Sequence, residues 1–368
     1  MRALPAPKED FIGLDDIVHL ATGGQPPMLR AHRDVFEQFT LDKATGMEGY
    51  QGHWARVNEV RSQLAALVNL TPRDIALTGN ASEAIAKVVS SFDWQPHDNV
   101  VVAALDYASG RFALSQLEKF GVTVRTVPCD GWMIDSNALL DACDLKTRLV
   151  YISQVNALTG QHMDIAKISS ALSGTTTALL VDASHALGVV PVPGDLCDFL
   201  VSSCYKFLLG IHDGMLGWNR TRWPDFSPSG VGWHSATSTA TGFAIKDDAQ
   251  RAEYGNVGHL GAYLLKISID YLNDFGIKAI ADHVRPLAGR LVEGMAQAGL
   301  MVMTPSDSKQ HAANAAFEWT DTELFVRRAQ AEGIILWGDN GRIRATAHLF
   351  TTEADIDRFL EQLPGYIA

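Results

Sequence analysis

The sequence predicts an α/β fold, with a mainly parallel, doubly wound sheet in a large domain and a smaller α+β domain. Between residues 72 and 202, short apolar or β-branched runs alternate with amphipathic stretches, which is the pattern of a parallel sheet covered by helices. At 368 residues, of which 47% are hydrophobic, the chain exceeds one typical domain and can build a sizeable core. We therefore expect a large domain over residues 15–265 and a small domain made of 1–14 and 266–368.

The N-terminal part of the chain predicts an arm, a loop and helices. Residues 1–20 are polar and contain proline, and the following segment LATGGQPPM has the glycine and proline content of a loop. From Arg30 to Leu70 the apolar residues recur at helical spacing. We expect the stripe that they form to belong to the core.

The doubly wound region alternates strands with helices. After Pro72, strands are expected at 74–78, 99–105, 122–128, 148–155, 177–183 and 196–202. The helices between them are expected at 82–92, 109–120, 136–143 and 164–172. The segment MLGW after Gly214 predicts one more strand.

Beyond this strand the pattern changes. The segment from Trp223 to Gly242 is rich in Trp, Gly and Ser, has weak periodicity and predicts a long loop. A long helix is expected at 257–275. From 278 onward, helix, strand, helix, strand and helix follow, with AANAAFEW and GRIRATAH as the two strands. This order fits the smaller α+β domain.

Composition narrows the range of partners and compartments. The balance of 30 basic and 42 acidic residues gives a net charge of −12, which disfavours nucleic acid and anionic membranes as partners. The N-terminus MRALPAPKED lacks the apolar core of a secretory signal, and no apolar run is long enough to cross a bilayer, so we expect a cytoplasmic protein. The four cysteines lack C-x-x-C spacing, so neither a metal site nor a disulfide framework is expected.

Asp182 and Lys206 are the main candidates for a catalytic site. Each follows an apolar strand, where open α/β sheets place their ligand groups. A lysine amine can form a Schiff base with an aldehyde cofactor, and a carboxylate can keep a pyridine nitrogen protonated so that the ring accepts electrons. Desolvation lowers the pKa of a lysine and exposes a neutral nucleophile. For either residue taken alone, a structural role is the alternative.

The residues around this pair resemble a known family. The pattern D-A-S-H-A-L-G, then Asp195 and Phe199, then S-S-C-Y-K-F-L-L-G, is similar to the class V aminotransferase family of pyridoxal phosphate (PLP) enzymes, which has the PLP-dependent transferase-like fold type I. Kynureninases, isopenicillin N epimerases, cysteine desulfurases and carbon–sulfur lyases also belong to it. The S-x-Y-K motif is closest to the kynureninase and epimerase branches, because desulfurases usually have His where this chain has Tyr205. The resemblance implies that Lys206 holds PLP and that Asp182 contacts its pyridine nitrogen.

The phosphate of PLP is expected at the start of a helix. The strand IALT runs into T-G-N-A-S-E-A, and backbone N–H groups at a helix N-terminus bind phosphate, so Ala81 and Ser82 would hold it. From the residues alone, an ordinary N-cap is the alternative. The similarity to the family's T-x-G-A-T-E-A motif favours the phosphate. Ser203 and His234, the latter in G-W-H, are further phosphate candidates.

Five more residues take their expected roles mainly from the resemblance. Tyr107, in L-D-Y-A-S, could stack on the pyridine ring, where many desulfurases have His. Asn156, in N-A-L-T-G, could donate to the phenolic oxygen of the cofactor, with His185 near the same atom; a satisfied turn is the competing explanation. Trp233 and Asn256 lie where the family contributes residues across a dimer interface, so a homodimer with shared active sites is expected.

A clamp for the substrate carboxylate is expected near the C-terminus. In R-I-R-A-T-A-H, alternation puts Arg342 and Arg344 on one face of a strand, and a guanidinium can bind an α-carboxylate with two hydrogen bonds. The similarity to the family's R-I-S-x-H segment selects Arg344. An exposed salt bridge is the alternative.

The reaction is expected to start from an α-amino acid bound to PLP as an external aldimine. Lys206 can then remove the α-proton, and the resulting quinonoid can lead to transamination, epimerisation or loss of a β-group. We expect an aminotransferase first. A lyase of the kynureninase or carbon–sulfur type or an epimerase is the alternative, and a non-catalytic regulatory relative is the alternative of another class. A persulfide-forming desulfurase is disfavoured, because such enzymes use a later mobile cysteine and the last cysteine here is Cys204.

Overall fold

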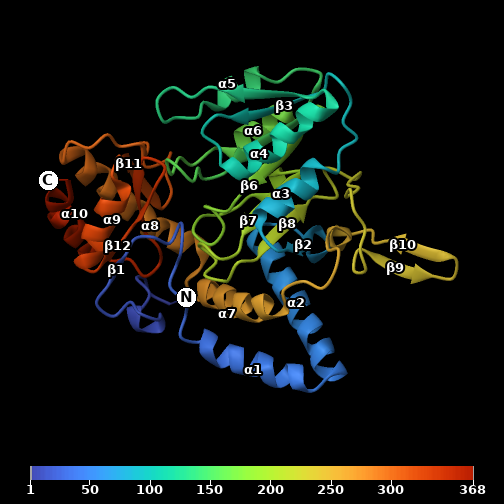
Figure 1. Cartoon of the computed structure of the whole chain (residues 1–368), viewed down its shortest axis with the longest axis horizontal. Helices are drawn as coiled ribbons and strands as arrows, with labels where there is room; N and C mark the ends of the chain where they lie inside the picture. The colour runs from blue at the N-terminus through green and yellow to red at the C-terminus, as the bar shows by residue number, and fades with distance from the viewer. Residues whose placement is uncertain (1, 368) are drawn as a thin grey trace.

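The computed structural model describes residues 2–367 and is built around a seven-stranded sheet (Figure 1). From edge to edge the strands are β2 (Ile75–Thr78), β8 (Gly214–Trp218), β7 (Phe199–Ser203), β6 (Ala178–Asp182), β5 (Thr147–Ser153), β3 (Asn99–Ala103) and β4 (Thr123–Val127). Strand β8 runs antiparallel to both of its neighbours, and the remaining neighbouring pairs are parallel. The predicted mainly parallel α/β sheet is therefore confirmed.

Both faces of this sheet are buried, because alternate residues of a strand point to opposite sides. On β3, Val100 and Val102 belong to one hydrophobic core, and Val101 and Ala103 belong to another. The first core includes α3 (Ala81–Val89) and α4 (Ala108–Ser115); the second includes α2 (Met47–Leu67), α5 (Ser136–Asp141), α6 (Ile165–Leu172) and α7 (His259–Phe275). Helix α1 (His32–Ala44) packs outside α2 and α7.

The C-terminal elements gather on one side of the large sheet around a smaller, three-stranded antiparallel sheet (Figure 1). Its strands are ordered β11 (Asn314–Glu318), β14 (Arg342–Thr346) and β13 (Trp337–Asp339). The helices around it are α8 (Ile277–Gln297), α9 (Thr322–Ala331) and α10 (Glu353–Ile367). The three helices and the strands β11 and β14 agree with the order predicted after residue 278, whereas β13 and another short strand at 334–335 were not predicted.

The N-terminal arm is bound to this C-terminal region. The short strand β1 (Val18–His19) pairs in parallel with β12 (Ile334–Ile335), and the N–H of Ala6 donates to the carbonyl of Leu349 at 2.7 Å. Helix α7 runs without a break through residue 266, where the sequence placed the start of the small domain. The exact division into two domains stays a prediction.

The prediction of a long loop from Trp223 to Gly242 is wrong in its second part, because that part belongs to a β-hairpin. Strands β9 (Ala236–Thr239) and β10 (Gly242–Ile245) pair antiparallel and project away from the large sheet, on the side opposite the C-terminal helices (Figure 1). Nearly all of their residues are exposed, so neither face has to be apolar. The hairpin therefore lacks the alternation by which a half-buried strand is recognised.

No helix within residues 2–367 is both long and apolar enough to span a membrane.

Candidate active site

A cavity lies at the carboxyl ends of the central parallel strands, where α3 begins. Its lining comes from the ends of β3, β5, β6 and β7 and from the turns that follow them, and consists of Asn80, Ala81, Ser82, Ile85, Tyr107, Ser109, Ser153, Val155, Ala157, Asp182, Ser184, His185, Ser203, Tyr205 and Lys206. Most residues that the sequence singled out are therefore brought together here: Ala81, Ser82, Tyr107, Asp182, His185, Ser203, Tyr205 and Lys206. Convergence at strand ends is expected for a ligand site in an open α/β sheet.

Asp182 is the last residue of β6 and is held by two hydrogen bonds. The N–H of Ser184 donates to its Oδ1 at 2.8 Å, and the hydroxyl of Tyr151 donates to its Oδ2 at 3.1 Å. Tyr151 lies on the adjacent strand β5 and is fully buried, and burial raises its pKa well above the usual value of 10. The hydroxyl therefore stays protonated and keeps donating to the carboxylate.

Asp106, next to Tyr107, places a second carboxyl group close to this pair. Its Oδ1 accepts the N–H of Ser153 at 3.0 Å, whereas its buried Oδ2 has no hydrogen-bond partner within residues 2–367. Burial raises the pKa of Asp106 to about 7, and the charge of Asp182 adds to the shift. Neither Tyr151 nor Asp106 is predicted as a site residue from the sequence. The signal for Tyr151 was a hydroxyl inside an otherwise apolar strand.

Lys206 follows β7 and projects into the cavity between two tyrosines. Its Nζ lies 5.4 Å from the ring centre of Tyr107 and 5.7 Å from that of Tyr205. The side chain is buried, and burial lowers its pKa to about 8; the charge of Arg344 acts in the same direction, while Asp182 opposes it. A neutral amine is thus accessible near neutral pH, as a nucleophile or a base requires.

The far end of the cavity is the start of α3. Asn80 caps the helix, since its Oδ1 accepts the N–H of Glu83 at 2.8 Å, and the hydroxyls of Ser82 and Ser109 lie 2.7 Å apart. The buried Oγ of Ser203 has no hydrogen-bond partner in the described part of the chain. A Cβ on Gly214 would lie 2.4 Å from the backbone carbon of Asn80, so a glycine is needed for β8 to pass this turn. The N-cap and an anion at the free N–H groups are compatible.

Arg344 reaches the cavity from β14. Its Nη1 donates to the carbonyl of Ala157, which lines the cavity, at 2.7 Å. His185 is linked to the neighbouring strand β11 through Asn314, whose Nδ2 donates to His185 Nδ1 at 3.1 Å. Burial lowers the pKa of His185 well below 6.5, and the charges of Lys206 and Arg344 add to the effect. The imidazole is therefore neutral at neutral pH.

Besides Arg344, which contacts the lining residue Ala157, four predicted residues do not line the cavity. The side chain of Asn156 is held in a turn, where its Oδ1 accepts the N–H groups of Leu158 and Thr159 and its Nδ2 donates to the carbonyl of Leu105. Trp233 is 69% exposed. The roles expected for Asn156, Trp233, His234 and Asn256 stay predictions.

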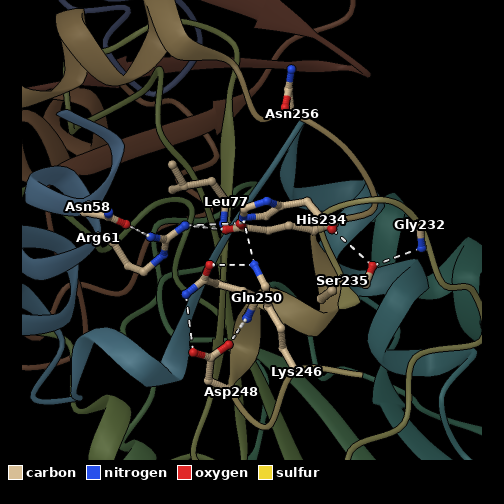
Figure 2. Close-up of polar contacts among 12 residues, drawn as sticks. Asn58, Arg61, Leu77, Gly232, His234, Ser235, Lys246, Asp248, Gln250 and Asn256 are labelled. Carbon is tan, nitrogen blue, oxygen red and sulfur yellow. Dashed lines mark hydrogen bonds and ion pairs between the residues drawn. The ribbon is translucent and has the colours of Figure 1, made fainter. Parts of the chain in front are cut away.

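His234 belongs to a separate buried polar cluster beside β2, and Asn256 stands apart from it (Figure 2). The Nε2 of His234 lies 3.2 Å from Oε2 of Glu253 and 3.2 Å from Nζ of Lys246. Glu253 also pairs with Arg61 of α2, at 2.9 Å, and accepts the N–H of Leu77 on β2 at 2.8 Å. Because β2 is an edge strand, Glu253 satisfies a backbone group that has no neighbouring strand.

The groups in the cavity suit PLP. The cavity holds a carboxylate with an oxygen bound by Tyr151, a helix start with the paired hydroxyls of Ser82 and Ser109, and the desolvated amine of Lys206. The unpartnered Oγ of Ser203 is the kind of buried donor that a phosphate oxygen would satisfy.

Comparison with known proteins agrees with this geometry. The model of the family described as aminotransferase class-V matches residues 37–359. A probable cysteine desulfurase of Methanothermobacter thermautotrophicus is 28% identical over 263 residues, which cover 70% of this chain and 66% of that protein, so the match spans about two thirds of its length. The isopenicillin N epimerase of Streptomyces clavuligerus is 25% identical, with 94% of each chain covered.

The solved structures confirm the fold. A variant of the cystine C–S lyase C-DES, with glycine linked covalently to its PLP cofactor, superposes with a TM-score of 0.86 at 21% identity and covers 97% of this chain and 99% of that chain. The type I fold inferred from the sequence is thereby confirmed, and the match to the family model confirms the PLP cofactor. Since the family model spans most of the chain, the protein belongs to the class V aminotransferases, a family of PLP-dependent enzymes.

Proposed function

We propose that this enzyme transfers the amino group of an α-amino acid. The observation that supports it is the buried Lys206 amine, whose pKa is lowered to about 8, in one cavity with Asp182 and within reach of the Arg344 charge. PLP, when bound, supplies an aldehyde that condenses with amines and a ring that accepts electrons. Lys206 would hold the aldehyde carbon, and Asp182 the pyridine nitrogen.

The remaining residues would orient the cofactor and the substrate. Ala81, Ser82 and Ser203 would bind the phosphate, and the Tyr107 ring would cover the pyridine. Arg344 would bind the α-carboxylate of the substrate by two parallel hydrogen bonds. The substrate's Cα–H would then point toward the Lys206 amine, which takes up the proton.

The proton carriers in the cavity favour transamination. This reaction needs one group that accepts a proton and returns it, and Lys206 is suited to do both. Elimination needs in addition an acid beside the leaving group. His185 does not supply it, because burial lowers its pKa far below neutrality, and the pKa of Tyr205 is raised by burial.

A carbon–sulfur β-lyase is the second candidate, because the cystine C–S lyase C-DES has the same fold and one relative is named a probable cysteine desulfurase. A hydroxyl of Tyr107 or Tyr205 would then have to protonate the leaving group. A persulfide carried on the enzyme is not supported. Cys204 is fully buried, burial raises the pKa of its thiol, and the sequence after it has no cysteine.

A homodimer is part of the proposal. Trp233 and Asn256 lie outside the cavity of their own chain, and the segment after Gly230 carries further exposed apolar side chains: Val231 at 48%, Phe243 at 66% and Ile245 at 41%. A second copy would cover them and could bring both residues to its partner's cavity. Sedimentation of the holoenzyme tests this assembly.

Visible absorbance and peptide mapping test the function. The purified protein should bind added PLP with a new visible band, and borohydride should fix the cofactor on Lys206. With an amino acid alone, an aminotransferase loses this band and recovers it when a keto acid is added, whereas a lyase releases a keto acid and keeps the band. A cofactor fixed on another residue would contradict the assignment of Lys206.

A further inference from the structure

A second arginine, Arg342, shares the face of β14 that carries Arg344. The alternate residues Ile343 and Ala345 are fully buried in the core on the other face. Thr346, next on the arginine face, donates to Oδ1 of Asn314 at 3.0 Å, and Asn314 in turn donates to His185. The arginine face of β14 is therefore turned toward the cavity that His185 lines.

The positive charge on this face is only partly balanced by the described residues. The two residues are buried, at 4% and 3% exposure for Arg342 and Arg344. Arg342 has one carboxylate partner, Asp339, with 2.9 Å between Nη1 and Oδ1, and Arg344 has none within the described residues. The Nε of each lacks a hydrogen-bond partner in the same part of the chain. Since a buried guanidinium is costly unless it is paired, an anionic ligand is expected here.

Both charges act on the groups of the cavity. Burial lowers the pKa of Arg342, and Asp339 and Tyr107 partly oppose this shift, so Arg342 lies within electrostatic range of a cavity wall. A Cβ on Gly23 would lie 3.1 Å from Cε1 of His185 and 3.2 Å from Cζ of Arg344, so the Arg344 guanidinium stands beside the His185 ring.

The partner of Arg342 is suited to be displaced. Asp339 ends the short strand β13, and its side chain is 37% exposed, whereas that of Arg342 is 5% exposed. The indole N–H of Trp337 donates to Asp339 Oδ2 at 3.0 Å, which can hold the carboxylate after Arg342 has released it. A carboxylate that is partly in water keeps much of its hydration and gains little from this pair.

We propose that the substrate carries a second anionic group of carboxylate type on its side chain, which Arg342 binds while Arg344 binds the α-carboxylate. Two residues apart on a strand, the arginines stand about 7 Å from each other, so one small molecule can engage both. The inference rests on the proposed function and adds the class of substrate. The preferred amino acids are those with an acidic side chain.

Calorimetric titration of the PLP-loaded enzyme tests this without turnover. Succinate, with two carboxylates, is compared with propionate, which has one. In the unaltered enzyme succinate should bind on the order of 100-fold more tightly. Arg342→Met should bring succinate to the level of propionate and leave propionate unchanged. Arg342→Lys, which keeps the charge but loses the paired geometry, should retain part of the preference.

Arg327→Met is the matched control, because Arg327 of α9 is 66% exposed and pairs with Glu323 on the surface. It should leave both affinities unchanged. Equal binding of succinate and propionate, or a preference that survives in Arg342→Met, would overturn the proposal. Thermal melting shows whether each variant is folded. If Arg342→Met does not fold, the binding data of Arg342→Lys test the proposal.

The two proposals fail in different ways. If amino acids leave the visible band unchanged but succinate binding depends on Arg342, the proposed function fails and the dianion site stands. If alanine reacts as well as aspartate or glutamate and succinate binds no more tightly than propionate, the proposed function stands and the proposed dianion site fails.

Discussion

Two buried arginine sites in this chain differ in how their charge is balanced. Arg61 meets both oxygens of the fully buried Glu253 carboxylate, at 2.9 and 3.1 Å, and that carboxylate also accepts a backbone N–H and lies beside His234 (Figure 2). On β14, Arg342 has one partly exposed carboxylate and Arg344 has none in the described residues. Burial is nearly equal in the two places.

The difference indicates that a structural arginine is distinguished from a ligand-binding one by its carboxylate partners in the protein rather than by its burial. The same holds for buried acids. Burial raises the pKa of Glu253, but His234 and Arg61 outweigh it and the net pKa is lowered. Asp106 has no such partners, and burial raises its pKa to about 7. An unpartnered Nε is not the criterion, because Arg61 also has one within residues 2–367.

The largest effect is expected from breaking the balanced site. Glu253→Ala leaves the Arg61 guanidinium buried and unpaired, so the free energy of unfolding should fall by about 3–5 kcal/mol in urea denaturation. Glu59→Ala is the control, because its pair with Arg56 is exposed and should contribute less than about 1 kcal/mol. A Glu253→Ala variant as stable as this control would remove the contrast.

Arg344→Met should lower the activity of the enzyme rather than its stability. The substitution leaves no protein carboxylate unpaired, so the free energy of unfolding should change by less than about 1 kcal/mol. The loss of the substrate clamp should lower kcat/KM about 100-fold, which corresponds to about 3 kcal/mol of transition-state binding. Steady-state kinetics and urea denaturation of the same preparation check both parts. Lost stability with intact activity would make Arg344 structural.

Asp106→Asn sharpens the comparison of the two acids. The folded pKa of about 7 lies above the usual 3.8, so between about pH 4 and 7 the folded chain holds a proton that the unfolded chain releases. Stability from this group therefore falls as pH rises through that window. The variant should be more stable than the parent at pH 8 by about 4 kcal/mol, since each tenfold change in a proton equilibrium corresponds to about 1.4 kcal/mol, and the gap should close near pH 4. Urea denaturation at the two pH values decides it.

The smallest effect is expected at Tyr151. Tyr151→Phe removes one of two hydrogen bonds to Asp182 and keeps the ring, which corresponds to about 1 kcal/mol, or roughly fivefold weaker PLP binding. A titration of the apoenzyme followed by absorbance measures it. Unchanged affinity would mean that Ser184 alone holds the carboxylate.

Whether a residue could be predicted from the sequence depends on how far apart in the chain its interaction partners lie. Asp182, Lys206 and the helix start at Ser82 were found because each follows an apolar strand directly, so a local pattern locates it. Arg344 was found from alternation within one strand. The cavity depends on the same strand ends, which a parallel sheet brings to one edge.

The residues that were missed act over long distances in the sequence. The pair of Arg61 and Glu253 joins segments far apart in the chain, and the contact of Tyr151 with Asp182 depends on the register of β5 and β6. The unpaired state of Asp106 Oδ2 follows from the absence of a neighbour among the described residues, which no local pattern encodes. The hairpin β9–β10 could not be predicted, because both of its faces are exposed and its sequence therefore needs no alternation of apolar and polar residues.

The pairing of β1 with β12 can form only late in the synthesis of the chain. Val18 pairs with Ile334, about 300 residues later in the chain, and the loop with Gly23 lies against Arg344. At about 5–20 residues per second, a ribosome needs roughly 15 to 60 seconds to deliver those partners. Throughout that interval the segment around Val18 lacks the strand with which it pairs, so in the nascent chain it is open to chaperones and proteases.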